Sequence, residues 1–160
     1  MWEVFKIKSV MRKASNAIAY VKGGKNNPDL HGIVTFRQTE KGVLVTAKIF
    51  GLPQGINGYT GIFAFHIHEG TSCAGKDGEE FVFTGGHYNP SGLPHPYHAG
   101  DLPPLFENKG YAYMSVLTDR FTVRDILGRV VIIHSSYDDF TTQPSGNPGN
   151  KIACGKIIMQ

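Results

Sequence analysis

The sequence predicts an all-β domain: an eight-stranded, immunoglobulin-like Greek-key β-sandwich or barrel with two long functional loops. Its 160 residues suit a single domain that can bury its own core. Short runs in which apolar and polar residues alternate recur along the chain, and turn-forming residues separate them. The 20 glycines and 9 prolines favour many turns, and the signals for helices are weak. Together these observations favour short strands paired around one core.

The expected strands follow one another at hairpin spacing. Alternation or a short apolar run places strands at residues 16–22, 30–38, 43–50, 62–69, 110–117, 128–135 and 151–159. Residues 23–28 and 39–42 contain the glycine, asparagine and lysine expected of turns between the first strands. Residues 122–127 fit either one helical turn or a plain connector.

Two polar segments predict the long loops. Residues 70–105 are almost entirely glycine, proline, asparagine, histidine and charged residues, with one apolar break at residues 81–83. Residues 140–150 form the second polar segment. Long loops in compact domains usually carry function. Residues 1–14 are expected to be an N-terminal extension, ahead of a single domain at residues 15–160.

Composition disfavours several classes of partner. The net charge is +3 and the pI is about 8.9, without a block rich in lysine and arginine, so no nucleic-acid partner is expected. No membrane partner is expected either, because no run approaches the roughly 18 apolar residues of a spanning helix. The first residues lack the apolar core of a signal peptide. This predicts a cytoplasmic location, or a periplasmic or secreted one if a leader has been removed.

The two cysteines, Cys73 and Cys154, lie far apart in the sequence. They form no C-x-x-C motif, which disfavours a zinc ribbon or a thioredoxin-like site. Their spacing alone leaves two alternatives open. They are either free buried thiols, as is common in a reducing compartment, or one disulfide that closes a long loop.

Six of the seven histidines lie between residues 66 and 134. His66 and His68 are two apart on a predicted strand, so their rings point to the same face, about 6–7 Å apart. Two such rings can reach one ion, although a polar strand face gives the same pattern. His134 ends an apolar strand, where a lone histidine is more often part of the core. His31 has no neighbouring ligand type and is assigned no role.

The predicted loop adds a second set of candidate ligands. It contains three histidines and one carboxylate: His87, His95, His98 and Asp101. Four such groups are a common ligand set for structural zinc, and a bound ion would hold a long irregular loop in place. A solvated histidine-rich loop is the alternative. The glycines and prolines between the histidines favour a tightly wound ligand loop.

Several stretches together carry a resemblance to a known family. They are residues 65–69 (FHIHE), 86–90 (GHYNP), 98–102 (HAGDL), 128–134 (GRVVIIH), 138–139 (DD) and 153–155 (ACG). Over about residues 15–160 the chain resembles the copper/zinc superoxide dismutases, and residues 70–73 (GTSC) are more similar to the bacterial branch.

The resemblance implies a role for each candidate. Copper would be bound by His66, His68, His87 and His134. Zinc would be bound by His87, His95, His98 and Asp101, so that His87 is shared between the metals. Asp138 would tie a copper histidine to a zinc histidine and so fix both rings. Cys73 and Cys154 would form the disulfide that anchors the ligand loop to the last strand.

The implied reaction is the disproportionation of superoxide, the substrate, to oxygen and hydrogen peroxide. His87 and Lys151 would be the catalytic residues, with His87 carrying a proton. The family has an arginine at the position of Lys151. Lysine keeps the charge but lacks the planar five-donor fork, so lowered activity is expected.

Two further departures from the family pattern stand out. Residues 141–150 contain no charged residue, and Ala64 occupies the place of a usual glycine. Two alternatives to the enzyme are a copper/zinc carrier or buffering protein with little turnover, and a zinc-only domain. The sequence leaves a homodimer and a monomer both open.

Overall fold

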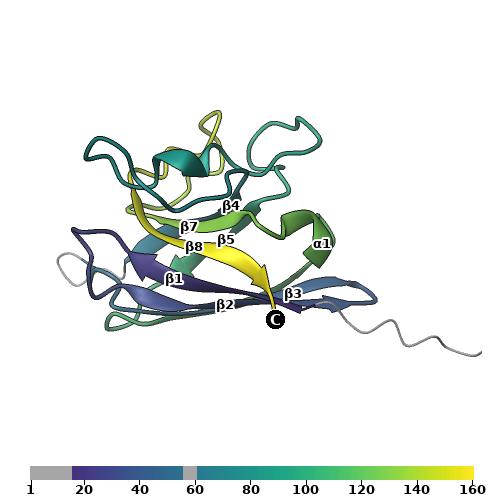
Figure 1. Cartoon of the computed structure of the whole chain (residues 1–160), viewed down its shortest axis with the longest axis horizontal. Helices are drawn as coiled ribbons and strands as arrows, with labels where there is room; N and C mark the ends of the chain where they lie inside the picture. The colour runs from purple at the N-terminus through teal and green to yellow at the C-terminus, as the bar shows by residue number, and fades with distance from the viewer. Residues whose placement is uncertain (1–15, 56–60) are drawn as a thin grey trace, which may run out of the picture.

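Eight antiparallel strands form one strongly curved sheet that curls into a nearly closed barrel (Figure 1), which confirms the predicted all-β class. The computed structural model describes residues 16–55 and 61–160, so the predicted extension at 1–14 lies outside the described residues. The strands are β1 (Asn16–Gly23), β2 (His31–Thr39), β3 (Gly42–Phe50), β4 (Ile62–His68), β5 (Asp101–Phe106), β6 (Ala112–Thr118), β7 (Val130–His134) and β8 (Lys151–Met159).

The strand order is β5-β4-β7-β8-β1-β2-β3-β6, so chain neighbours are not always sheet neighbours. The two outer strands, β5 and β6, contact each other and bring the ends of the sheet together. Alternate side chains of each strand point into the barrel. On β3, for example, Val43, Val45, Ala47 and Ile49 are fully buried. This apolar burial is the main term that stabilises the barrel.

The prediction of one loop over residues 70–105 is wrong at its end. Strand β5 occupies the last part of that segment and pairs with β4, with Ile62 opposite Phe106. The adjacent Pro103 and Pro104 hide this strand in the sequence, because proline interrupts the alternation. Proline is nevertheless tolerated there, since β5 is an outer strand whose free side needs no backbone donors.

Helical structure is limited to short turns within the described ranges. The segment expected to be one turn or a connector contains α1 (Val123–Ile126), whose start is capped reciprocally by Thr122 and Asp125. The 3₁₀ turn η1 (Val82–Thr84) lies inside the first long connection. Among the described helices, none has the length and apolar character that a membrane crossing requires.

Two long connections lie on the same side of the barrel, over β4, β7 and β8 (upper half of Figure 1). They span residues 69–100 and 135–150. A disulfide joins Cys73 in the first connection to Cys154 on β8, which confirms the predicted pairing over the free thiols. It closes a loop of 81 residues, for which a chain-entropy model gives a stabilisation of about 4–5 kcal/mol.

Candidate metal centre

Three strands and one connection bring the predicted ligands together. His66 and His68 lie on β4, His134 ends β7, and Asp101 begins β5. The β4–β5 ladder places His66 opposite Asp101, and an isolated bridge places His87 opposite His68. Strand pairing therefore fixes the backbone positions of residues that are far apart in the sequence.

The first cluster consists of four histidines that each offer a ring nitrogen within 4.8 Å of the others. Its members are His66, His68, His87 and His134. The Nε2 atoms of His68 and His134 are 3.2 Å apart. A tetrahedral ion with metal–nitrogen bonds of 2.0–2.1 Å would hold its ligand atoms roughly 3.3 Å apart. The spacing of this pair therefore suits two ligands of one ion.

Hydrogen bonds outside the first cluster fix which ring nitrogens carry protons. His66 donates from Nε2 to Asp138 Oδ2 at 2.7 Å, and His68 donates from Nδ1 to the Gly85 carbonyl at 2.9 Å. The second nitrogen of each ring is therefore left with a lone pair for the cluster. Among the described residues, His66 Nδ1 and His87 Nε2 are buried and have no hydrogen-bond partner. Buried lone pairs without protons fit a bound cation.

Burial keeps these rings neutral. It lowers the pKa of His66, lowers that of His68 further, and lowers the pKa of His134 to about 3. Charge repulsion from neighbouring histidines acts in the same direction. Neutral imidazole is the form that binds metals, so the three rings are ready to act as ligands at neutral pH.

The second cluster contains three histidines and one carboxylate, again with all ligand atoms within 4.8 Å. Its members are His87, His95, His98 and Asp101. The two oxygens of Asp101 lie 2.7 Å from His87 Nδ1 and 3.1 Å from His95 Nδ1. Burial opposes ionisation of Asp101, but the hydrogen bond with His87 and the charges of nearby histidines lower its pKa overall. Three imidazoles and one carboxylate are a suitable donor set for zinc.

His87 belongs to both clusters. Its Nδ1 faces Asp101 and lies 3.4 Å from His98 Nδ1, while its Nε2 lies in the first cluster. The ring centroids of His66 and His87 are 3.9 Å apart. One imidazole thus offers a nitrogen to each of two neighbouring cation sites. Losing both ring protons is costly unless two cations replace them, so the arrangement fits a pair of metals.

Asp138 connects the two clusters through ring nitrogens that point away from the cluster centres. It accepts hydrogen bonds from His66 Nε2 at 2.7 Å and from His95 Nε2 at 2.8 Å. Burial would raise the pKa of Asp138, but the hydrogen bonds from His66, the Phe140 amide and His95 outweigh it and hold the pKa well below its usual range. The ionised carboxylate fixes one ring of each cluster.

Gly146 leaves the space that Asp138 needs. A Cβ at this position would overlap Asp138 Oδ1 and His95 Nε2, and the backbone φ of +77° disfavours other residues independently. The Gly146 carbonyl also accepts from the Asp139 amide at 3.0 Å. The second long connection thereby packs directly against the carboxylate.

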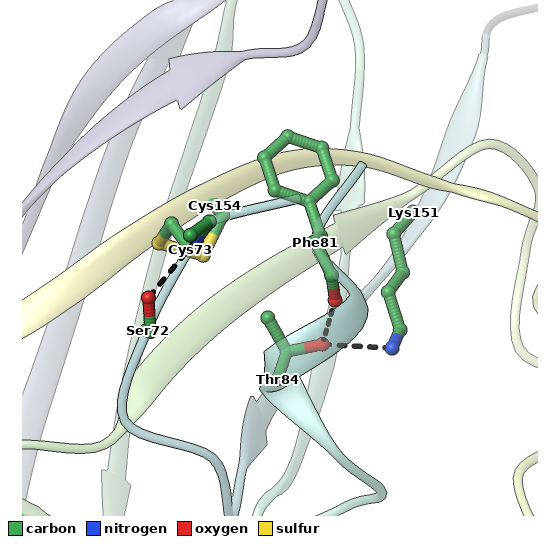
Figure 2. Close-up of a disulfide and its surroundings, with 7 residues drawn as sticks. Ser72, Cys73, Phe81, Thr84, Lys151 and Cys154 are labelled. Carbon is green, nitrogen blue, oxygen red and sulfur yellow. Dashed lines mark hydrogen bonds between the residues drawn. A yellow bond between two sulfur atoms is a disulfide. The ribbon is translucent and has the colours of Figure 1, made fainter. Parts of the chain in front are cut away.

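Lys151 begins β8 opposite His134. Its Nζ donates to Thr84 Oγ1 at 2.7 Å (Figure 2) and to the Gly85 carbonyl at 3.3 Å. The charge of Lys151 is close enough to His134 to contribute to the lowered pKa of that ring. The structure therefore places a cation beside the first cluster.

The residues that support these ligands carry no recognisable signal in the sequence. One terminal nitrogen of Arg120 donates to the carbonyls of Pro96, His98 and Asp101, at 3.2, 3.2 and 3.3 Å. A single arginine after a strand gives no signal of this role. Thr84, which holds Lys151, is likewise an ordinary residue in the sequence. Both contacts depend on how the first long connection folds.

Comparisons with known proteins agree with this geometry. A sequence model of the family described as copper/zinc superoxide dismutase (SODC) matches residues 30–157. The chain is 36% identical over 146 residues to superoxide dismutase [Cu-Zn] of Legionella pneumophila, covering 86% of this chain and 83% of that one. It is 35% identical over 140 residues to superoxide dismutase [Cu-Zn] of Photobacterium leiognathi, covering 79% and 78%. Extracellular superoxide dismutase [Cu-Zn] of Rattus norvegicus is 33% identical over 140 residues, covering 81% and 55%.

Proposed function

The chain belongs to the copper/zinc superoxide dismutase family and is similar to its bacterial members. From this premise we propose which metal each of the two clusters binds and what its residues do in the reaction. It is an enzyme whose reaction is the disproportionation of superoxide to oxygen and hydrogen peroxide, with copper and zinc as cofactors. The observation that supports this reaction most directly is the shared ring of His87, which presents one nitrogen to each cluster.

We assign copper to the cluster of four histidines, because imidazole suits copper and this cluster contains no carboxylate. The copper ligands are then His66, His68, His87 and His134. The cluster with the carboxylate is assigned to zinc. Its ligands are His87, His95, His98 and Asp101.

Bound copper supplies a one-electron couple, so that one superoxide is oxidised to oxygen and a second, with two protons, is reduced to hydrogen peroxide. The chain contributes position, charge and protons. His87 Nε2 can hold a proton inside the first cluster, while His87 Nδ1 stays beside Asp101 in the second cluster and keeps the ring in place. Asp138 accepts a hydrogen bond from His66 and from His95 and so fixes the orientation of both rings. Lys151 provides the positive charge that attracts the anionic substrate.

Single-ligand variants test this assignment. His134→Ala removes a ligand of the first cluster alone, and we expect it to lose copper and keep zinc. His98→Ala removes a ligand of the second cluster alone, and we expect the reverse. His31→Ala is the matched control, because His31 is exposed and bonds to the Asp29 carbonyl at 2.7 Å. Metal content per chain is the measurement, and loss of the opposite metal in either variant would contradict the assignment.

We further propose that the protein works in an oxidising compartment, which favours a periplasmic or secreted location over the cytoplasmic one. The disulfide between Cys73 and Cys154 supports this, since such bonds persist mainly outside reducing compartments. One relative is named as extracellular. Fractionation of the source cells tests it, and recovery with cytoplasmic markers would contradict it.

The homodimer stays a prediction, which light scattering on the purified protein would test.

A further inference from the structure

The hydroxyl of Thr84 lies between Lys151 and the backbone of the first long connection (Figure 2). Thr84 ends η1 and is fully buried. Its Oγ1 is 2.7 Å from the Phe81 carbonyl oxygen and 2.7 Å from Lys151 Nζ. A buried hydroxyl with two bonds of this length has a fixed orientation.

The direction of both bonds follows from the groups involved. The Phe81 carbonyl can only accept, so the hydroxyl of Thr84 donates its single proton there. Its lone pairs are then left to accept from the ammonium of Lys151. A bond from a charged donor at this distance is at the strong end of the range.

The neighbouring carbonyl completes the arrangement. The Gly85 oxygen accepts from Lys151 Nζ at 3.3 Å and from His68 Nδ1 at 2.9 Å. Residues 84–85 therefore hold the lysine cation and one histidine of the first cluster on the same short piece of backbone. An ammonium has three donors, and these contacts use two, which leaves one for an anion.

From these contacts we propose that Thr84 is a positioning residue for Lys151. Its hydroxyl fixes the ammonium beside the first cluster, so that a small anion meets a cation with one free donor. An arginine could engage several acceptors through its planar fork, whereas a lysine on its flexible stem needs an acceptor placed where the ammonium must stay. The proposal rests on the proposed function, because it takes the first cluster as the copper site.

Azide is a suitable probe, since it is a small anion whose binding to the copper- and zinc-loaded protein can be followed by visible absorption. Thr84→Val keeps the shape and removes the hydroxyl, and we expect it to weaken azide binding about fivefold. The Phe81 carbonyl keeps its bond from the Thr84 amide, at 3.3 Å. Thr84→Ser retains the hydroxyl and should stay within about twofold of the parent. Thr46→Val, which removes a hydroxyl paired with Ser115 on the β3–β6 ladder, is the matched control.

A double-mutant cycle separates positioning from a general structural effect. Lys151→Gln removes the cation, so adding Thr84→Val in that background should leave the azide dissociation constant unchanged. Acetylation of Lys151 by acetic anhydride, followed by peptide mass spectrometry, provides a readout that needs neither copper nor turnover. Its rate should rise several-fold in Thr84→Val and stay at the parent value in Thr84→Ser.

The outcomes distinguish this inference from the proposed function. Parent-like azide binding and parent-like Lys151 acetylation in Thr84→Val would overturn the inference and leave the enzyme assignment intact. A further loss of azide affinity when Thr84→Val is added to Lys151→Gln would also overturn it. If the parent protein with both metals neither binds azide nor consumes superoxide, the proposed function fails, and the acetylation rates still decide whether Thr84 holds Lys151.

Discussion

At the residue scale, Asp138 contacts one histidine of each cluster, and no lysine or arginine pairs with it among the described residues. Asp138→Asn keeps the size but replaces one accepting oxygen by a donating amide, which cannot accept from a ring N–H. We expect the affinity for both metals to fall about 10–100-fold, as measured by competition with chelators.

The neighbouring Asp139 is the matched control for that change. Its carboxylate accepts from the amides and hydroxyls of Thr141 and Thr142 and caps the loop without contacting a histidine. Asp139→Asn should therefore alter metal affinity much less than Asp138→Asn does. Equal effects of the two substitutions would show that Asp138 acts through loop stability and not through the rings.

Lys151 is the second decisive residue, because the family resemblance implies an arginine at its position. A guanidinium can hold an anion through two parallel N–H bonds, which an ammonium cannot do. We expect Lys151→Arg to raise turnover about two- to fivefold, equivalent to about 0.4–1 kcal/mol. Steady-state superoxide assays at equal copper content are the measurement. An unchanged or lowered rate would contradict a limiting role for the lysine.

At the element scale, Arg120 lies just after β6 and donates to two carbonyls of the first long connection and to the Asp101 carbonyl at the start of β5. Arg120→Lys keeps the charge, but its side chain is one bond shorter, so the ammonium does not reach the position of the guanidinium nitrogen that contacts all three carbonyls. We expect zinc affinity to fall about tenfold in a chelator competition, with copper affinity changed less. Arg124→Lys on α1 makes the same substitution at an exposed position and should have no effect. Parent-like zinc affinity in Arg120→Lys would show that Arg120 does not support the zinc site.

The strands and the connections differ in how much the sequence reveals. The pair His66 and His68 is visible because strand geometry puts residues two apart on one face. Strand β5 is hidden because Pro103 and Pro104 break the alternation that marks the other strands. The contacts of Arg120 and Thr84 are hidden for a different reason. They join segments 19 to 67 residues apart, and no local pattern encodes where a long connection folds back.

At the scale of the whole molecule, the net charge of +3 is spread without a dominant patch in the sequence, and residues 141–150 carry no charge. Steering of superoxide should then depend on few local charges, with Lys151 the nearest identified cation. We expect the rate to fall by less than about threefold between roughly 20 and 200 mM salt. A tenfold fall measured by pulse radiolysis would point to steering charges elsewhere on the surface.

Two metal sites that share His87 are tested most directly by metal analysis of the purified protein combined with a superoxide assay. We predict one copper and one zinc per chain, together with rapid disproportionation that is lost when copper is removed. Zinc alone in both sites, or full copper and zinc loading without turnover, would contradict it. The latter result would indicate a metal carrier with the ligand geometry of an enzyme.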